Sequence, residues 1–413
     1  MKILIVNKFF YPRGGPETVM FQQMKHLQSL GHEVIPFAMQ DERNLETEYS
    51  RHFVSNVDYH QINGSPVKNA RIALKMIYSA EAKQKIERLL DETKPNIAHL
   101  HNIYHQISPS ILGALNRRKI PVVMTLHDFK LLCPSYSFYR DGHNCEECAG
   151  RRFYRAVQHR CIQDSRLKSL VCALEGYYHR WLGTYLENVN QFIALSRFSQ
   201  KKFIEYGLPE KKVFSLPNCL DVWDYIPDYK KKGYVLFAGR LNQRYGVFAL
   251  LEAASQLPQI EIRIAGTGEE EEKARKFVEE KQLKNVRFVG QLAPLQLRQS
   301  MSESYFMVFP STVYHNCPMV ILESFALGKP VIATNLGSVP ELVRNNSTGL
   351  LFETRSVRDL VDKLKRLYQD PHKVREYGKN ARKLVEEKYS TEKYYPRLLG
   401  LYQKLLDRSR YDN

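Results

Sequence analysis

The sequence predicts an α/β protein made of two doubly wound, Rossmann-like domains that face a central cleft. Short apolar runs alternate with amphipathic stretches in both halves of the chain. At 413 residues, the chain is also too long for one ordinary core. A linker through Trp223 and Pro227 to Lys232 separates the two alternating patterns. We therefore expect a first domain at 1–215 and a second at 216–390.

The composition is that of a globular protein with a strong positive charge. Lys and Arg number 61 against 44 Asp and Glu, a formal net charge of +17. An anionic membrane surface or a phosphorylated substrate would suit this charge. Nucleic acid is disfavoured, because the basic residues are spread over many segments without a basic tail or a known nucleic-acid motif. No apolar run approaches the roughly 20 residues of a membrane span, and Lys2 to Val6 is expected to be a strand, so we expect a cytoplasmic protein.

The first half is expected to bind a ligand at the loops that follow its strands. Gly14-Gly15 lies between the first strand and an amphipathic helix, where backbone can approach a ligand closely. Four histidines are predicted at the same rim of the sheet: His99, His101, His105 and His127. This rim is where α/β proteins bind ligands. A satisfied core histidine is the simpler interpretation of any one of them.

Four of the seven cysteines fall within one stretch: Cys133, Cys145, Cys148 and Cys161. In a reducing compartment such a group favours a metal over disulfides, and four thiolates would complete a structural zinc site. The alternative is a set of partly buried thiols in an irregular loop. Basic and aromatic residues then mix over 150–186. This second stretch is either a solvated helical face or a surface that rests on anionic lipid headgroups.

The second half contains the most informative stretch, 305–343. An apolar strand ends near Phe309, a polar loop follows, and Pro318 suits the first residue of a helix that ends at Gly328. Free N–H groups and the helix dipole together favour an anion at such a position. The stretch therefore predicts a phosphate site. Glu323 lies within the helix, and His315 precedes it by eight positions.

Several short motifs along the chain resemble those of the retaining glycosyltransferases of family 4, which have the GT-B fold. They are PRGGPE, GHEV, TLHDF, LPNCLD, FAGRL, IAGTG, FVGQL, NCPMVILE and GSVPELV, in this order. The segment after TLHDFKLLCPSY looks like a subgroup from bacterial polysaccharide gene clusters. The resemblance implies an acceptor domain at 1–215, a donor domain at 216–390, and a last helix, 391–413, that packs back on the first domain.

The resemblance also implies an activity. The protein would move a sugar from a nucleotide diphosphate donor to a hydroxyl acceptor with retention of the anomeric configuration. A lipid-linked glycan of a surface polysaccharide (capsule, O-antigen or exopolysaccharide) would be the acceptor, and the protein would sit peripherally on the inner face of the cytoplasmic membrane. No metal or other cofactor would be required, because protein cations stabilise the leaving diphosphate.

Residue roles follow from the resemblance. Arg240 would clamp the diphosphate, the N–H groups of Met319 and Val320 would cap it, and Glu323 would bind the ribose. Gly14-Gly15 would approach the phosphates, and His127 would contact the transferred sugar. The other donor-site positions are Asn218, Arg244, Tyr245, Gly266, Leu292, His315, Cys317 and Pro318.

Two positions depart from the family pattern. His315 stands where a first Glu usually contacts the donor sugar, and Tyr245 stands at the place of a second diphosphate-binding Lys, with Arg244 one residue earlier. An imidazole offers fewer acceptor sites than a carboxylate. A different donor sugar, slow transfer or a loss of enzymatic activity would each fit. The alternative functions are a non-catalytic partner of polysaccharide assembly that binds nucleotide or glycan, and a sugar-nucleotide epimerase.

Overall fold

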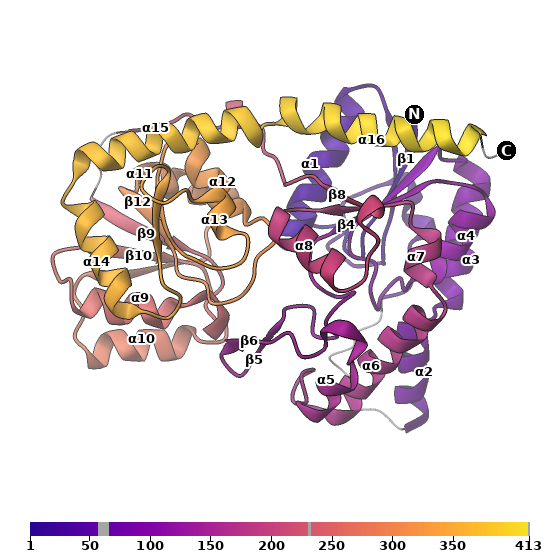
Figure 1. Ribbon diagram of the computed structural model, residues 1–413, viewed down its shortest axis with the longest axis horizontal. Coiled ribbons are helices and arrows are strands. Elements are labelled where there is room, and N and C mark those ends of the chain that lie inside the picture. Colours follow the sequence, from indigo (N-terminus) through magenta and orange to yellow (C-terminus); the bar gives the residue numbers. More distant parts are fainter. Residues whose placement is uncertain (57–65, 230–232, 412–413) are drawn as a thin grey trace. The chain divides into compact units, whose positions relative to one another are not determined.

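The computed structural model describes residues 1–56, 66–229 and 233–411, and the chain divides into two compact units (Figure 1). Unit 1 comprises 1–137, 146–216 and 396 onward, and unit 2 comprises 138–145 and 217–395. The short segment 138–145, which we expected in the first domain, thus groups with unit 2. Two parts of the expected elements, 230–232 of the linker and 412–413 of the tail, lie outside the described residues.

Unit 1 is built on a six-stranded sheet with the order β2-β1-β3-β4-β7-β8, in which every pairing is parallel. Its strands are β1 (Lys2–Val6), β2 (Glu33–Phe37), β3 (Ile97–Leu100), β4 (Val122–Leu126), β7 (Gln191–Ala194) and β8 (Val213–Ser215). The residues of β3 and β4 are buried throughout, as expected for a parallel sheet covered on both faces. The predicted doubly wound architecture is confirmed for this unit.

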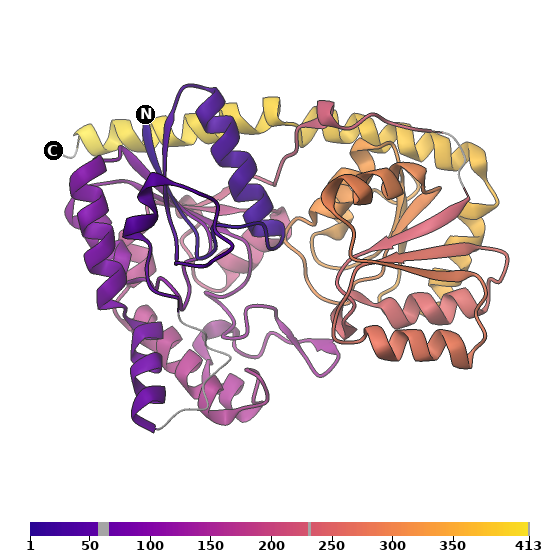
Figure 2. The ribbon, with the colours of Figure 1, turned by 180° about the vertical axis from the view of Figure 1, so that it is seen from behind.

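Helices cover the sheet of unit 1, and a second group of helices forms a lobe beside it (Figures 1 and 2). The first group is α1 (Gly15–Ser29), α3 (Ala80–Thr93), α4 (Ser110–Arg117) and α8 (Arg197–Glu205). The lobe contains α2 (Pro66–Ile77), α5 (Tyr154–Gln158) and α6 (Arg166–Trp181), and α7 (Thr184–Asn188) connects it to the sheet beside α4. The helix α2 was not predicted, because the residues from about 41 to 80 are polar and poorly patterned.

Unit 2 repeats the architecture with a parallel sheet in the order β11-β10-β9-β12-β13-β14. Its strands are β9 (Tyr234–Ala238), β10 (Glu261–Ala265), β11 (Val286–Gly290), β12 (Phe306–Phe309), β13 (Val331–Thr334) and β14 (Gly349–Phe352). Its helices are α9 (Val247–Ser255), α10 (Glu271–Glu280), α11 (Pro294–Glu303), α12 (Met319–Ala326), α13 (Val339–Leu342), α14 (Val357–Tyr368) and α15 (Pro371–Lys388). One apolar core lies between this sheet and the helices α9 and α14.

The last helix, α16 (Thr391–Tyr411), contains Pro396, at which the chain returns to unit 1. Leu398 and Tyr402 are fully buried, and the Tyr402 hydroxyl lies 2.5 Å from Nδ1 of His99 in β3. The helix thus contributes core residues to unit 1. None of the helices in the described part of the chain combines the length and the apolar character that a membrane crossing requires.

Candidate functional site

The carboxyl edge of the unit 2 sheet gathers most of the predicted donor-site residues. Because all its strands are parallel, the loops after β9, β10, β11 and β12 open at the same edge. Arg240 follows β9, Gly266 follows β10, Leu292 follows β11, and 311–320 follow β12. These positions, far apart in the sequence, are therefore neighbours in the fold.

The loop between β12 and α12 is held by hydrogen bonds to the carbonyl of Arg244. Thr312 donates from its N–H at 2.9 Å, Ser311 Oγ lies 3.1 Å from the same oxygen, and Thr312 Oγ1 lies at 3.2 Å. Gly246, with φ of +73°, passes so close to Pro310 that an added Cβ would stand 2.0 Å from the Pro310 carbonyl oxygen. Only glycine fits there, and the turn that carries Arg244 and Tyr245 therefore packs tightly on this loop.

His315 lies between two aromatic rings and is bonded to a serine. Its Nε2 is 2.7 Å from Ser311 Oγ, and its ring centroid is 5.6 Å from that of Tyr245 and 5.0 Å from that of Phe309. Burial lowers the pKa of His315 to about 4, so the imidazole is neutral near pH 7. The two positions that depart from the family pattern, Tyr245 and His315, are thus in contact.

Arg240 and Arg244 supply the exposed cations of this edge. Neither guanidinium has an ion-pair partner among the residues that the structure describes, which leaves both available to an anion. The Arg244 guanidinium lies over the Tyr139 ring, 5.5 Å from its centroid. The helix α12 begins one residue later than predicted, at Met319, and Pro318 is its N-cap without a side-chain hydrogen bond. The first N–H groups of α12, including those of Met319 and Val320, are groups of the kind that bind anions at helix N-termini.

Glu323 is the carboxylate of α12. Burial raises its pKa above the ordinary value, and Arg298 opposes that rise. No hydrogen bond to the Glu323 carboxylate is found within the described residues. Asn218 joins the edge from the linker, because its Nδ2 donates to the Cys317 carbonyl at 3.2 Å. The site therefore combines two cations, free backbone donors and one carboxylate.

A hairpin that sequence reasoning missed also contributes to this edge. Strands β5 (Tyr139–Arg140) and β6 (His143–Asn144) pair antiparallel within the segment that groups with unit 2. The Tyr139 hydroxyl is 3.3 Å from Thr312 Oγ1, and Asn144 Nδ2 donates to the Thr312 carbonyl at 3.0 Å. The Asp141-Gly142 pair is typical of a hairpin turn, but the two-residue strands beside it have no pattern that the sequence could show.

In unit 1, the structure brings three of the four predicted histidines together. Nδ1 of His101 is 2.8 Å from Nε2 of His127, and the His101 ring stacks on the His99 ring at 4.8 Å. Burial lowers the pKa of His99 and of His127 to about 3. The row therefore consists of neutral imidazoles. Gly14, the N-cap of α1, and Gly15 lie at the same edge of the sheet.

The structure does not support the predicted zinc site, because the four cysteines form no group with ligand atoms close enough for a metal among the residues that the structure describes. Cys145 belongs to the hairpin that groups with unit 2, whereas Cys148 and Cys161 pack with an apolar cluster of unit 1, and Cys133 Sγ lies 3.2 Å from Ser135 Oγ. Within the described ranges, the residues with ligand atoms close enough for a metal are His105, Cys172 and Glu175 instead.

The Glu175 carboxylate already has a cation. It accepts from the Lys130 ammonium at 2.8 Å, and both side chains are buried. Burial alone would lower the pKa of Lys130, but the Glu175 carboxylate raises that pKa above its ordinary value. His105, the fourth predicted histidine, lies 3.5 Å from the same carboxylate. This group is a buried ion pair, which the sequence did not indicate because its partners are 45 residues apart.

The fold defines the class of the molecule: two parallel six-stranded α/β units, one of them with two exposed arginines and a helix N-terminus at its carboxyl edge, as in GT-B proteins. Two families match the chain. "Glycosyltransferase Family 4" matches residues 13–223, and "Glycosyl transferases group 1" matches residues 226–384. The chain belongs to glycosyltransferase family 4 and is a glycosyltransferase.

Relatives and solved structures agree with that assignment. An uncharacterised glycosyltransferase of Methanocaldococcus jannaschii is 23% identical over 98% of this chain and 99% of its own length. A putative colanic acid biosynthesis glycosyltransferase of Escherichia coli is 26% identical, over 48% of this chain and 53% of its own length. The Anabaena protein HepE, solved in complex with UDP, has a TM-score of 0.70 at 17% identity and covers 98% of this chain and 100% of its own. At that identity the last likeness shows the fold.

Proposed function

We propose that the protein transfers a sugar, with retention, from a nucleoside diphosphate donor to a hydroxyl of a lipid-linked glycan during surface-polysaccharide synthesis. The observation that carries the proposal is the carboxyl edge of unit 2. There, Arg240 follows β9, and the neighbouring strand β12 leads into α12, which carries Glu323 and whose N-terminus has no side-chain cap among the described residues. Cations and N–H groups bind a diphosphate, and a carboxylate binds ribose hydroxyls.

Each group has a role as the donor bond breaks. Negative charge develops on the leaving diphosphate while the sugar becomes oxocarbenium-like. Arg240 and the N–H groups of Met319 and Val320 stabilise that charge, and Arg244 is the second cation in place of the absent lysine. We assign the remaining donor positions (Asn218, Gly266, Leu292, Cys317 and Pro318) to shaping the same edge.

Contacts with the transferred sugar and the acceptor are assigned to the carboxyl edge of unit 1, through His127 and the Gly14-Gly15 turn. The acceptor oxygen bonds to the anomeric carbon as the bond to the diphosphate breaks, and the acceptor proton leaves with the diphosphate. A neutral His127 acts as a hydrogen-bond partner in this scheme, since its pKa is about 3.

Two comparisons support the donor and the pathway. HepE, which shares the fold, was solved with UDP, and the E. coli relative carries the description of a colanic acid biosynthesis glycosyltransferase. Uridine nucleotide sugars are therefore the first donors to test, and a polysaccharide intermediate is the first acceptor class.

The decisive test is nucleotide release from a panel of UDP-, GDP- and dTDP-sugars, with Arg240→Ala as the variant. We expect turnover with one donor and, for the variant, a loss of nucleotide affinity of about tenfold or more, because a charge-assisted contact is removed. Arg358→Ala, on the exposed face of α14, is the matched control and should leave affinity unchanged. Nucleotide binding without turnover of any donor would instead support the non-catalytic partner.

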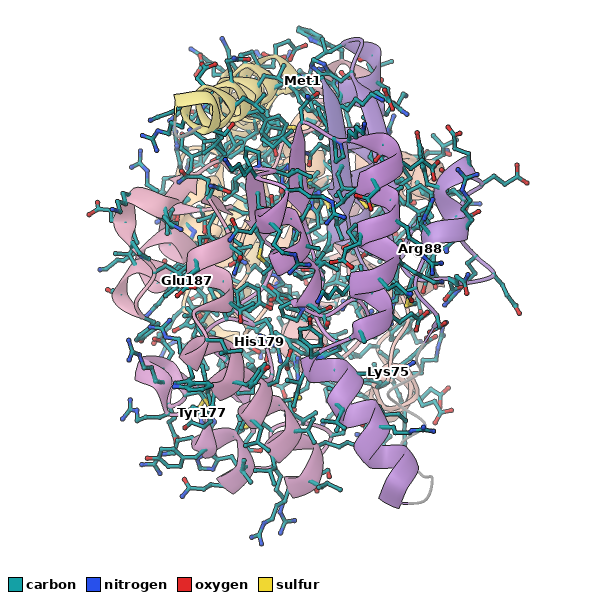
Figure 3. All side chains as sticks on the ribbon, turned by 90° about the vertical axis from the view of Figure 1, so that its right-hand side faces the viewer. Met1, Lys75, Arg88, Tyr177, His179 and Glu187 are labelled. Atoms are coloured by element: carbon teal, nitrogen blue, oxygen red, sulfur yellow. The ribbon has the colours of Figure 1, made fainter. Side chains whose placement is uncertain are left out.

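A peripheral membrane position is part of the proposal, and α6 supports it. One face of this helix is apolar and exposed, with Leu167, Leu170, Leu174, Tyr178 and Trp181 three or four positions apart. Leu167 is 61% exposed and Trp181 82%. The neighbouring α2 adds Leu74 and Lys75, and Figure 3 shows the two helices side by side. An apolar face flanked by cations such as Arg166 suits an anionic interface.

Flotation with vesicles that contain anionic lipid tests this surface. The full chain should bind, and high salt should weaken the binding. Trp181→Glu should reduce binding by about tenfold, because it places a carboxylate among anionic headgroups. Ile226→Glu, at an equally exposed residue of unit 2 (82%), should not. Equal binding by both variants and the wild type would exclude the α6 face as the contact surface.

A further inference from the structure

The hydroxyl of Ser311 lies among three partners, and this arrangement fixes where its proton goes. Ser311 Oγ is 3.1 Å from the Arg244 carbonyl oxygen, 2.7 Å from His315 Nε2, and 3.5 Å from the Val313 N–H. A carbonyl oxygen can only accept, and a hydroxyl has one proton to give. If that proton went to His315, two oxygen lone pairs would face each other at 3.1 Å. Ser311 therefore donates to the Arg244 carbonyl.

The protonation of the His315 ring follows from this. With its own proton committed, Ser311 Oγ is an acceptor toward His315, so the imidazole must carry a hydrogen on Nε2. Burial keeps the ring neutral, with a pKa of about 4, and a neutral imidazole has one N–H. Nδ1 is then a bare lone pair. No partner for Nδ1 occurs in the part of the chain that the structure describes, and the residue as a whole is partly exposed.

The hairpin supports the same arrangement from the other side of the loop. Thr312 Oγ1 can donate to the Tyr139 hydroxyl, which leaves the two lone pairs of the Arg244 carbonyl to the Thr312 N–H and the Ser311 hydroxyl. The Ser338 hydroxyl donates to the His315 carbonyl at 2.6 Å, and Thr334 Oγ1 donates to the Ser311 carbonyl at 2.7 Å. The backbone on both sides of the imidazole is thereby fixed.

We propose that Ser311 is a positioning residue that holds His315 as its Nε2–H tautomer, so that Nδ1 presents an uncharged hydrogen-bond acceptor to a hydroxyl of the donor sugar. The proposal rests on the proposed function, which puts the donor at this edge, and adds the means of sugar recognition. A lone pair accepts a hydroxyl hydrogen as a carboxylate oxygen would, but without negative charge. The site would then favour a sugar that offers a hydroxyl donor at this position over one that lacks it.

The tautomer can be measured directly on the full chain labelled with ¹⁵N-histidine, by long-range ¹H–¹⁵N correlation. The signals of His315 are assigned by their loss in His315→Gln. We expect a protonated Nε2 and a bare Nδ1 in the wild type at neutral pH. A proton on Nδ1, or an imidazolium, would overturn the proposal whatever the variants do.

Kinetics then test the role of Ser311. Ser311→Ala should raise the KM for the donor sugar nucleotide by about tenfold, while inhibition by the nucleoside diphosphate alone changes much less, because the Thr312 N–H still holds the Arg244 carbonyl. Ser311→Thr keeps the hydroxyl and should restore the KM. Ser304→Ala removes a comparable buried bond, to the Met301 carbonyl, and is the matched control.

The two hypotheses fail in different ways. If the wild type turns over a donor but Ser311→Ala leaves its KM unchanged, or Ser304→Ala raises it equally, Ser311 has no positioning role. If the wild type neither binds nor turns over any sugar nucleotide, the proposed function is wrong, and the spectrum still decides the tautomer.

Discussion

Both units contain neutral imidazoles that make hydrogen bonds to hydroxyl groups. His99 is the clearest case: it is fully buried and lies between Thr125 Oγ1 at 2.7 Å and the Tyr402 hydroxyl at 2.5 Å. His315 is the corresponding residue in unit 2. Protonating such a ring would require a buried cation without a carboxylate beside it, which burial in a low-dielectric environment disfavours.

Stability should therefore fall in mild acid. The pKa of His99 is about 3 in the folded chain and about 6.5 when unfolded, so the unfolded chain binds more protons between those values. The contribution of neutral His99 to the free energy of unfolding is complete above pH 6.5. It decreases as the pH falls below that value, by about 2 kcal/mol near pH 5. Urea titrations across this range should show the loss, and His99→Gln should reduce the slope. An unchanged slope would contradict the buried neutral assignment.

At the scale of elements, the helix α16 has one buried face and one exposed face. Its buried residues Leu398, Tyr402 and Leu405 recur at three- and four-residue spacing. Gly400 stands on the exposed side, and a Cβ added there would meet no heavy atom within 4 Å. One helix thus offers a core position and an open position two residues apart.

Opposite effects are expected from the two positions. Leu398→Ala should lower the free energy of unfolding by about 2–5 kcal/mol, because it removes buried methyl groups and leaves a cavity. Gly400→Ala should raise it by about 0.5–1 kcal/mol, because alanine restricts the unfolded chain and favours a helix. Denaturant unfolding of the full chain measures both. A destabilising Gly400→Ala would show that this face is packed.

The elements also show how much of the structure could be predicted from the sequence. Strand patterns and the Pro318 and Gly328 signals were sufficient for the doubly wound architecture of both units and for the loop that carries His315, although β8 and β14 were not predicted as strands. The hairpin could not be predicted, because its β5 and β6 have two residues each and its partners, Thr312 and Arg355, lie far along the chain. The His99–Tyr402 bond spans 303 positions and was equally hidden. Local patterns specify elements, whereas long-range polar contacts depend on the finished fold.

At the scale of the whole molecule, the two units differ in what they offer to a ligand. Unit 2 holds the carboxyl edge of its sheet, with Arg240 and the helix α12 that contains Glu323. Unit 1 holds the row of imidazoles and the exposed face of α6. The positive net charge of +17 suits both an anionic donor and an anionic surface. Because each unit has its own sheet and core, each is expected to unfold as a cooperative body.

Calorimetry should resolve this. We expect two transitions, and the donor nucleotide should stabilise only the unit that holds the site. The free energy of unfolding of that unit should rise by about 2.7 kcal/mol when the ligand concentration is 100-fold above its Kd. Arg240→Ala should abolish that shift and leave the other transition in place. A single transition that nucleotide shifts as a whole would show that the units unfold together.

The return of the chain at Pro396 has a consequence for biosynthesis. A ribosome delivers 396–411 only after it has made all of unit 2, yet Leu398 and Tyr402 belong to the core of unit 1. Domains usually fold in the order in which they emerge. Here the first unit must wait, with the His99 side of its sheet uncovered, until the second has left the exit tunnel. Nascent chains stalled before α16 should therefore be the form that chaperones and proteases recognise.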